Sequence, residues 1–199
     1  MESNAATQAS VDPTHGQGYL DTAITVERQI GREKLIIQTG LMAKQADGAV
    51  LVCYRDSAVL VAVTSAKPMR EQDFFPLTVD YRERTSAAGK FPGGFIKRET
   101  RPSQKEIVTM RCMDRPIRPL FAKGYKDEIE VMATTISADP DYDPDVLAMI
   151  GGFACLHISK IPFLGPVGSV RVGMIDGQPM LFPTYEERKK GQLELIVSA

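Results

Sequence analysis

Two short runs rich in Val and Leu, separated by three polar residues, limit the folds open to this chain. The runs cover residues 49–54 and 58–64, and Arg55-Asp56-Ser57 lies between them. This pattern predicts an antiparallel β-hairpin. Further hairpins are expected around Gly31 and around Asp176-Gly177. Other than the first pair, the expected strands cover residues 23–30, 34–39, 76–81, 129–137, 169–175, 179–182 and 193–197.

A helix start signal follows the fifth expected strand. Ser103 and Glu106 have capping-box spacing, in which the serine side chain accepts from a backbone N–H and the glutamate reaches back. We expect this helix to end before Pro116, because proline disfavours helical backbone in the residue that precedes it.

A second helix is predicted from Asp143 to about Ile158. Asp143 is expected as its N-cap and Pro144 as its first residue. The helix is apolar nearly all round, so it belongs in the core, and Gly151-Gly152 within it suggests close packing. With a short helix over residues 185–190, the pattern predicts an α+β fold with mixed sheets and two or three helices.

The chain is expected to form one domain behind a polar tail. It has 199 residues, 43% of them hydrophobic, enough for one sizeable core. Residues 1–20 are expected to be a disordered tail, and residues 21–199 the domain. The chain stops on an apolar strand, which suggests a piece of a longer protein.

Signals for export and membranes are weak in this sequence. The N-terminal residues lack the pattern of a secretory or transit peptide, and no apolar run reaches the roughly 18 residues of a membrane span. The chain has three cysteines, which lie far apart along it. An odd number without close pairs favours a reducing compartment. We therefore expect a cytoplasmic protein with no membrane partner.

Positive charge is concentrated in one block. The formal net charge is −1, but residues 82–126 hold twelve Lys or Arg against four Asp or Glu. Within the block, residues 89–102 form a loop rich in Gly and Pro that combines cations with phenylalanines: Lys90, Phe91, Phe95, Lys97, Arg98 and Arg101. Cations that follow phosphates and rings that stack on bases are what single-stranded nucleic acid requires. The alternative is an ordinary surface loop whose phenylalanines are anchored in the core.

Two other groups of charged residues have weaker functional readings. Arg115 and Arg118 could clamp a phosphate, but a structural role at the helix end, or pairing with Asp114, is the preferred interpretation. The run of alternating aspartates over residues 139–145 invites a metal-site reading. It lacks the spacing and glycine of an EF-hand, and capping of the next helix already accounts for one carboxylate.

Long segments of the chain resemble the first ribonuclease-PH-like domain of bacterial polynucleotide phosphorylases. The most specific are DFFPLTV, the RPSxxE stretch and DRPIRPLF, and the similarity extends from about Ile24 to the C-terminus. The resemblance implies a ββαβα-type fold. It also implies an enzyme with two such domains per chain, followed by KH and S1 RNA-binding modules, and a homotrimeric ring around a channel. Such an enzyme degrades single-stranded RNA from its 3′ end, with inorganic phosphate as co-substrate and Mg²⁺ as cofactor, and releases nucleoside 5′-diphosphates.

Family residues transfer unevenly to this sequence. The channel-constricting loop of the family usually reads Phe-Phe-Arg-Arg, and the matching residues here are Phe95, Ile96, Lys97 and Arg98, with Arg101 nearby. Positive charge is kept, whereas one ring is replaced by isoleucine. The family's phosphate-binding serines and metal-binding aspartates lie in the second domain, so none is carried over.

The resemblance therefore implies a domain that guides RNA and forms trimers, without catalytic residues or bound Mg²⁺ of its own. Two alternatives remain. The chain could be a self-sufficient phosphorolytic nuclease whose aspartate run holds magnesium. It could also be a non-enzymatic assembly domain whose basic loop faces a protein partner.

Overall fold

The computed structural model describes residues 23–69 and 73–199. The expected disordered tail over residues 1–20 lies outside the described residues. Within them, a six-stranded sheet, a three-stranded sheet and three α-helices make up the regular structure, together with two short 3₁₀ turns.

The larger sheet is mixed, and its strand order is β1-β2-β3-β4-β6-β5. Strands β1 to β4 form an antiparallel meander, β6 pairs antiparallel with β4, and β5 pairs parallel with β6 at the edge. The strand bounds are β1 Ile24–Ile30, β2 Glu33–Thr39, β3 Gly48–Tyr54, β4 Ser57–Ala66, β5 Leu77–Glu83 and β6 Glu128–Ser137. The first two predicted hairpins are therefore confirmed.

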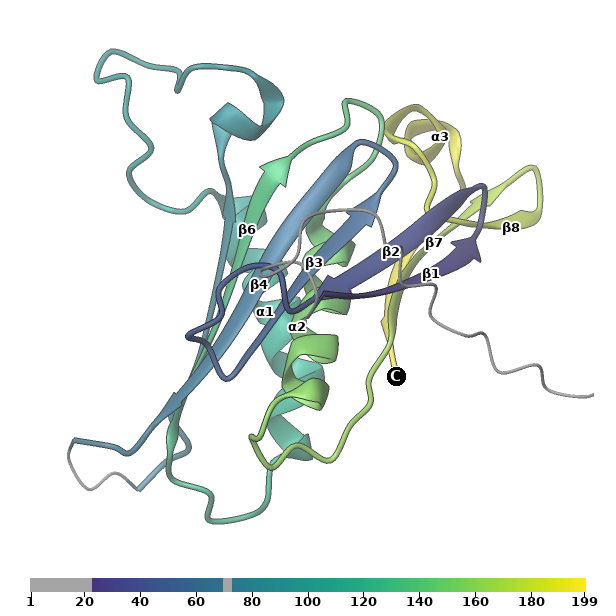
Figure 1. Cartoon of the computed structure of the whole chain (residues 1–199). Helices are drawn as coiled ribbons and strands as arrows, with labels where there is room; N and C mark the ends of the chain where they lie inside the picture. Colours follow the sequence, from purple (N-terminus) through teal and green to yellow (C-terminus); the bar gives the residue numbers. More distant parts are fainter. Residues whose placement is uncertain (1–22, 70–72) are drawn as a thin grey trace, which may run out of the picture.

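Helices α1 (Gln104–Ile117) and α2 (Asp145–Ile158) cover one face of this sheet (Figure 1). Helix α1 is the crossover that parallel pairing of β5 and β6 requires, because parallel strands cannot be joined by a tight turn. Alternate residues of β3, β4 and β6 face the helices and are buried, with Val52, Val61 and Val131 fully so.

Close packing of α2 depends on its two glycines. A Cβ on Gly151 would lie 2.6 Å from Val61 Cγ2, and one on Gly152 would lie 2.4 Å from Met113 Cε. The glycines therefore let α2 approach both the sheet and α1, which confirms the expectation from the sequence and offsets their low helix propensity.

Two helix boundaries differ from the sequence predictions. Helix α1 begins at the predicted capping box, but it ends at Ile117 and contains Pro116. Proline is tolerated there because it falls in the last turn, so only one helical hydrogen bond is lost. Helix α2 begins at Asp145 with Pro144 as its N-cap, one residue later than predicted. The Asp143 side chain is drawn instead into ion pairs, described below.

The C-terminal part forms a small antiparallel sheet of order β8-β7-β9 beside α2. Its strands are β7 Ser169–Ile175, β8 Gln178–Leu181 and β9 Leu193–Ser198, and α3 (Tyr185–Lys190) starts at a capping box on Thr184. The predicted α+β fold with a mixed sheet is confirmed. None of the helices in the described part of the chain is long and apolar enough to cross a membrane.

Candidate functional site

The basic segment between β5 and α1 projects from one end of the larger sheet (Figure 1, teal, upper left). It opens with the 3₁₀ turn Thr85–Ala88, and residues 89–103 then run without helix or strand to the cap of α1. Gly94 has a φ of 80° and Lys97 a φ of 54°, so the backbone turns sharply on both sides of Phe95 and Ile96. We call residues 89–102 the basic loop.

The apolar side chains of the basic loop face solvent. Phe91 is 90% exposed, Phe95 102% and Ile96 68%. The alternative in which these phenylalanines anchor the loop in the core is therefore wrong. Exposed rings are costly to leave in water but are available for stacking on a planar ligand.

The root of the basic loop is held by Glu99. Its Oε1 accepts hydrogen bonds from the backbone N–H and the hydroxyl of Thr85, each at 2.7 Å, and its Oε2 accepts one from Arg84 Nη1 at 2.8 Å. These bonds, first that from Arg84 and then those from Thr85, lower the pKa of Glu99 to about 2. The carboxylate is thus charged at any physiological pH.

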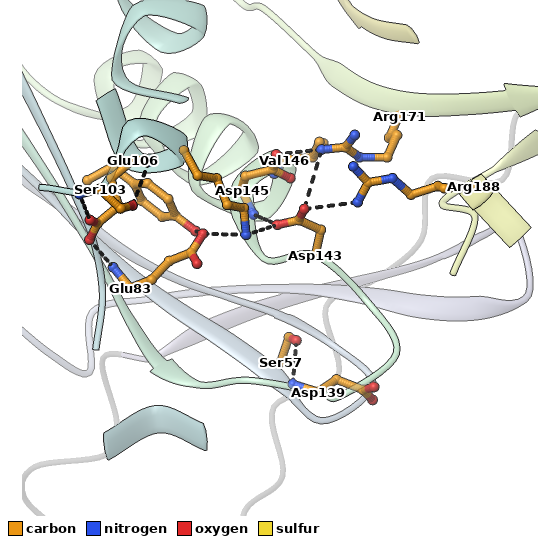
Figure 2. Close-up of polar contacts among 12 residues, drawn as sticks. Ser57, Glu83, Ser103, Glu106, Asp139, Asp143, Asp145, Val146, Arg171 and Arg188 are labelled. Carbon is orange, nitrogen blue, oxygen red and sulfur yellow. Dashed lines mark hydrogen bonds and ion pairs between the residues drawn. The ribbon is translucent and has the colours of Figure 1, made fainter. Parts of the chain in front are cut away.

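A second carboxylate joins the start of α1 to the end of β5. Glu106 accepts from the backbone N–H of Ser103 at 2.5 Å and from that of Glu83 at 2.8 Å (Figure 2). Glu106 is buried, and both of its oxygens are engaged. The two ends of the basic loop are therefore fixed to each other, whereas its middle is free of the core.

A pocket of about 340 Å³ lies at this root. Among the residues that line it, four are arginines: Arg82, Arg84, Arg98 and Arg101. Arg82 pairs with Asp80, and Arg84 pairs with Glu99. Within the described residues no carboxylate pairs with Arg98 or Arg101, so these two guanidinium groups are available to an anion.

The structure thus brings Arg98 and Arg101 together with residues that sequence reasoning did not single out. Arg82, Arg84 and Thr85 belong to the β5 end of the pocket and Glu99 to the loop. The basic block of the sequence included these arginines. It gave no sign of which would be neutralised, because that depends on contacts made in the folded chain.

The structure separates Arg118 and Arg115 from this pocket. Arg118 Nη2 lies 2.6 Å from an oxygen of Asp114, and its guanidinium donates to the carbonyls of Phe75 and Leu77 at 3.2 and 3.1 Å. Arg118 therefore ties the end of α1 to β5, which favours the structural interpretation over a phosphate clamp. Arg115 is exposed in the last turn of α1.

The aspartate run leads into a buried ion cluster beside α2 (Figure 2). Asp143 lies 2.7 Å from Lys105 Nζ and 3.0 Å from Arg188 Nη1, and Asp145 lies 2.5 Å from Arg171 Nη2. Burial alone would raise the pKa of Asp143, but the neighbouring cations, Lys105 above all, hold it below its usual value. Burial and the charge of Asp143 raise the pKa of Asp145.

The same carboxylates occupy the N-terminus of α2. Asp145 Oδ1 accepts from the backbone N–H of Val146 at 2.7 Å, and Asp143 Oδ1 from that of Asp145 at 3.4 Å. A helix N-terminus with free N–H groups is a common anion site. Here the protein's own side chains fill that position.

A magnesium site in the aspartate run has no support in the geometry. Asp139 and Asp141 both pair with Arg55 at 3.4 Å, and Asp143 and Asp145 belong to the ion cluster. Across residues 23–69 and 73–199, no three His, Cys, Asp or Glu side chains gather as a metal site would require. The carboxylates are neutralised by arginine and lysine, which is unfavourable for a divalent cation.

Comparison with solved structures defines the class of fold. The exosome of Archaeoglobus fulgidus with RNA bound to the active site matches with a TM-score of 0.59 at 20% identity, covering 87% of this chain and 73% of that one. Rice (Oryza sativa) Rrp46 matches with a TM-score of 0.59 at 15% identity, covering 89% and 78%. At such identities the similarity concerns the fold alone, which is RNase PH-like.

The model of the 3′ exoribonuclease family, domain 1, matches residues 32–162, and the chain belongs to this family. Two curated relatives are named polyribonucleotide nucleotidyltransferase. The one from Rhodopirellula baltica is 58% identical over 175 residues, and the one from Magnetococcus marinus is 52% identical over 171. These alignments cover 88% and 85% of this chain but only 23% and 24% of the relatives' length. The resemblance read from the sequence is therefore confirmed, and the chain spans about a quarter of the relatives it matches.

Proposed function

We propose that this chain is the RNA-guiding, trimer-forming domain of a phosphorolytic 3′-to-5′ exoribonuclease. The observation that carries the proposal is the basic loop, in which unpaired cations and solvent-exposed rings stand on a fixed root. Membership in the 3′ exoribonuclease family makes RNA the polyanion to expect.

The chemistry of the loop suits single-stranded RNA. Lys97, Arg98 and Arg101 supply charge for phosphate oxygens, and Phe95 supplies a face on which a base can stack. Ile96 offers apolar contact but no π-system. Binding should therefore be strongly salt-dependent and should discriminate little between sequences.

Catalysis belongs, in this proposal, to residues outside this chain. Phosphorolysis needs a place for inorganic phosphate and a divalent cation such as Mg²⁺ to offset charge in the transition state. At the N-terminus of α2, the place where phosphate would be expected is filled by Asp143 and Asp145. This argues against the self-sufficient nuclease. The three free cysteines suit a cytoplasmic enzyme.

The first experiment measures binding of single-stranded RNA to the 199-residue chain at two salt concentrations, with phosphate and Mg²⁺ present and products analysed. We expect salt-sensitive binding and no nucleoside diphosphate. The combined substitutions Lys97→Ala, Arg98→Ala and Arg101→Ala should reduce the slope of log affinity against log salt by about 2, since each lost phosphate contact removes about 0.7.

The matched control removes three exposed lysines elsewhere, with Lys67→Ala, Lys160→Ala and Lys190→Ala. It changes the net charge equally and should leave the salt slope close to that of the unaltered chain. An equal loss in both triple variants would reduce the site to general electrostatics. Unchanged binding after the loop substitutions would favour the non-enzymatic assembly domain, and release of nucleoside diphosphates would favour the self-sufficient nuclease.

A further inference from the structure

Glu99 is an acidic residue placed between the two unpaired arginines of the basic loop. In the chain it follows Arg98 directly and precedes Arg101 by two residues. In a segment that binds a polyanion, a negative charge at this position lowers the attraction that its neighbours create. Its contribution to binding must therefore come through geometry.

The contacts of Glu99 supply that geometry. Three hydrogen bonds, all of 2.7 or 2.8 Å, join it to Arg84 and Thr85, which stand at the opposite end of the loop. They span 14 and 15 residues and close the loop on itself. Glu106 makes the second closure one turn into α1 by accepting from Ser103 and Glu83. Residues 99 to 103 are therefore held at both ends, and the closure through Glu99 lies nearer to the loop tip.

We propose that Glu99 is a positioning residue for RNA, which closes the root of the basic loop and so holds Arg98 and Arg101 on the wall of the pocket. The inference rests on the proposed function of the loop. Without this closure, Arg98 would be carried by a chain fixed only at Ser103, and its ordering would be left to the moment of binding. Arg84 belongs to the same device, as the cation that compensates Glu99 and not as a phosphate contact.

The substitution Glu99→Gln gives opposite results under the two readings of this residue. If only charge matters, removing a negative charge beside two arginines tightens RNA binding. If Glu99 positions the loop, binding of a single-stranded oligonucleotide weakens by roughly three- to tenfold, the range that follows from leaving one or two long side chains unordered. The control is Glu130→Gln, which removes an exposed carboxylate on β6. It changes the net charge equally and should leave affinity unchanged or slightly higher.

Two further variants separate positioning from charge and from folding. Thr85→Val removes the hydroxyl that donates to Glu99 at 2.7 Å without altering the net charge, and it should weaken binding in the same direction by a smaller factor. Arg84→Gln and Glu99→Gln form a double-mutant cycle. If Arg84 serves only to hold Glu99, the double variant binds RNA no worse than Glu99→Gln alone. Thermal unfolding of each variant confirms that the fold is retained.

The outcomes distinguish this inference from the proposed function. RNA binding that is lost in the triple loop variant but tightened by Glu99→Gln would overturn the positioning role and leave the RNA interface standing. Independent, additive losses at Arg84 and Glu99 would also overturn it, since Arg84 would then contact RNA itself. Absence of salt-sensitive RNA binding by the unaltered chain would remove the proposed function first.

Discussion

The ion cluster beside α2 and the basic loop both gather charged side chains, but they leave them in opposite states. In the cluster, Asp143, Asp145 and Arg171 are buried and compensate one another. In the loop, Arg98 and Arg101 stand at the surface without a carboxylate partner among the described residues. The comparison teaches that the density of charge along a sequence does not mark a ligand site. What marks it is charge that the fold leaves unmatched.

The largest expected effect comes from breaking the buried side of this comparison. Arg171→Met removes the cation that contacts both Asp145 and Glu194 and leaves a buried carboxylate without its partner. We expect the free energy of unfolding to fall by about 3–5 kcal/mol, measured by urea denaturation. RNA affinity should not change, because the cluster lies outside the basic loop.

A control for this prediction restores the charge balance. Adding Asp145→Asn to Arg171→Met removes the uncompensated charge and should recover part of the lost stability. A loss below about 1 kcal/mol in the single variant, the size typical of exposed pairs, would mean that the cluster is hydrated in solution.

The next effect concerns the exposed ring of the basic loop. Phe95→Ala should weaken binding of single-stranded RNA by about 1–3 kcal/mol through lost base stacking. The salt slope should stay the same because no cation is removed. The measurement is a salt titration followed by fluorescence anisotropy, with Phe74→Ala as control, since Phe74 is also exposed but lies outside the loop. Equal losses in both variants would contradict a stacking role specific to Phe95.

A gain of affinity is expected from the neighbouring position. Ile96→Phe restores the second ring that the family's loop usually carries, and Ile96 is already 68% exposed, so no core contact is lost. We expect RNA binding to tighten by about 1 kcal/mol at unchanged thermal stability. Ile96→Leu is the matched control of similar size without a ring. Tightening in both variants would show that apolar contact, not stacking, is what the loop contributes.

The smallest effect lies between the two extremes, at a partly exposed pair. Glu187 accepts from Arg32, first among the causes that lower its pKa to about 2 from an ordinary value of 4.5. Because the pKa is lowered in the folded state, the stabilisation is complete above about pH 5.5 and is lost as pH falls through 4.5 toward 2. Glu187→Gln should therefore cost less than about 1 kcal/mol at pH 7 and nothing near pH 2. A difference in unfolding free energy that grows on acidification would contradict this assignment.

Local patterns predicted most of the elements, because the forces that set them act within a few residues. The capping box of Ser103 and Glu106, the turn at Arg55-Asp56 and the buried character of α2 were all legible in the sequence. Helix boundaries were less so. Pro116 falls inside α1 because the last turn can lose one hydrogen bond, a distinction that the rule for proline does not make.

Partner choice could not be predicted, because it is made across long separations. Arg171 finds Asp145 across 26 residues, and Arg188 finds Asp143 across 45. The sequence therefore suggested a metal site in the aspartate run as readily as an ion cluster. The same holds for Glu99, whose role depends on a loop closing back on Thr85. The resemblance to a family identified the RNA-facing positions, but it did not distinguish which arginines the fold compensates.

The edge position of β5 has a mechanical consequence. The basic loop leaves the sheet from the end of this strand, which is paired in parallel with β6 from Leu77 to Glu83. A pull on the loop directed away from that end of the sheet loads this ladder in shear, so that its hydrogen bonds bear the force together and not one after another. The other end of the loop passes the load into α1, which Met113 and Ile117 anchor in the core. A strand of RNA drawn along such a loop would thus pull on two of the firmest attachments that the fold provides.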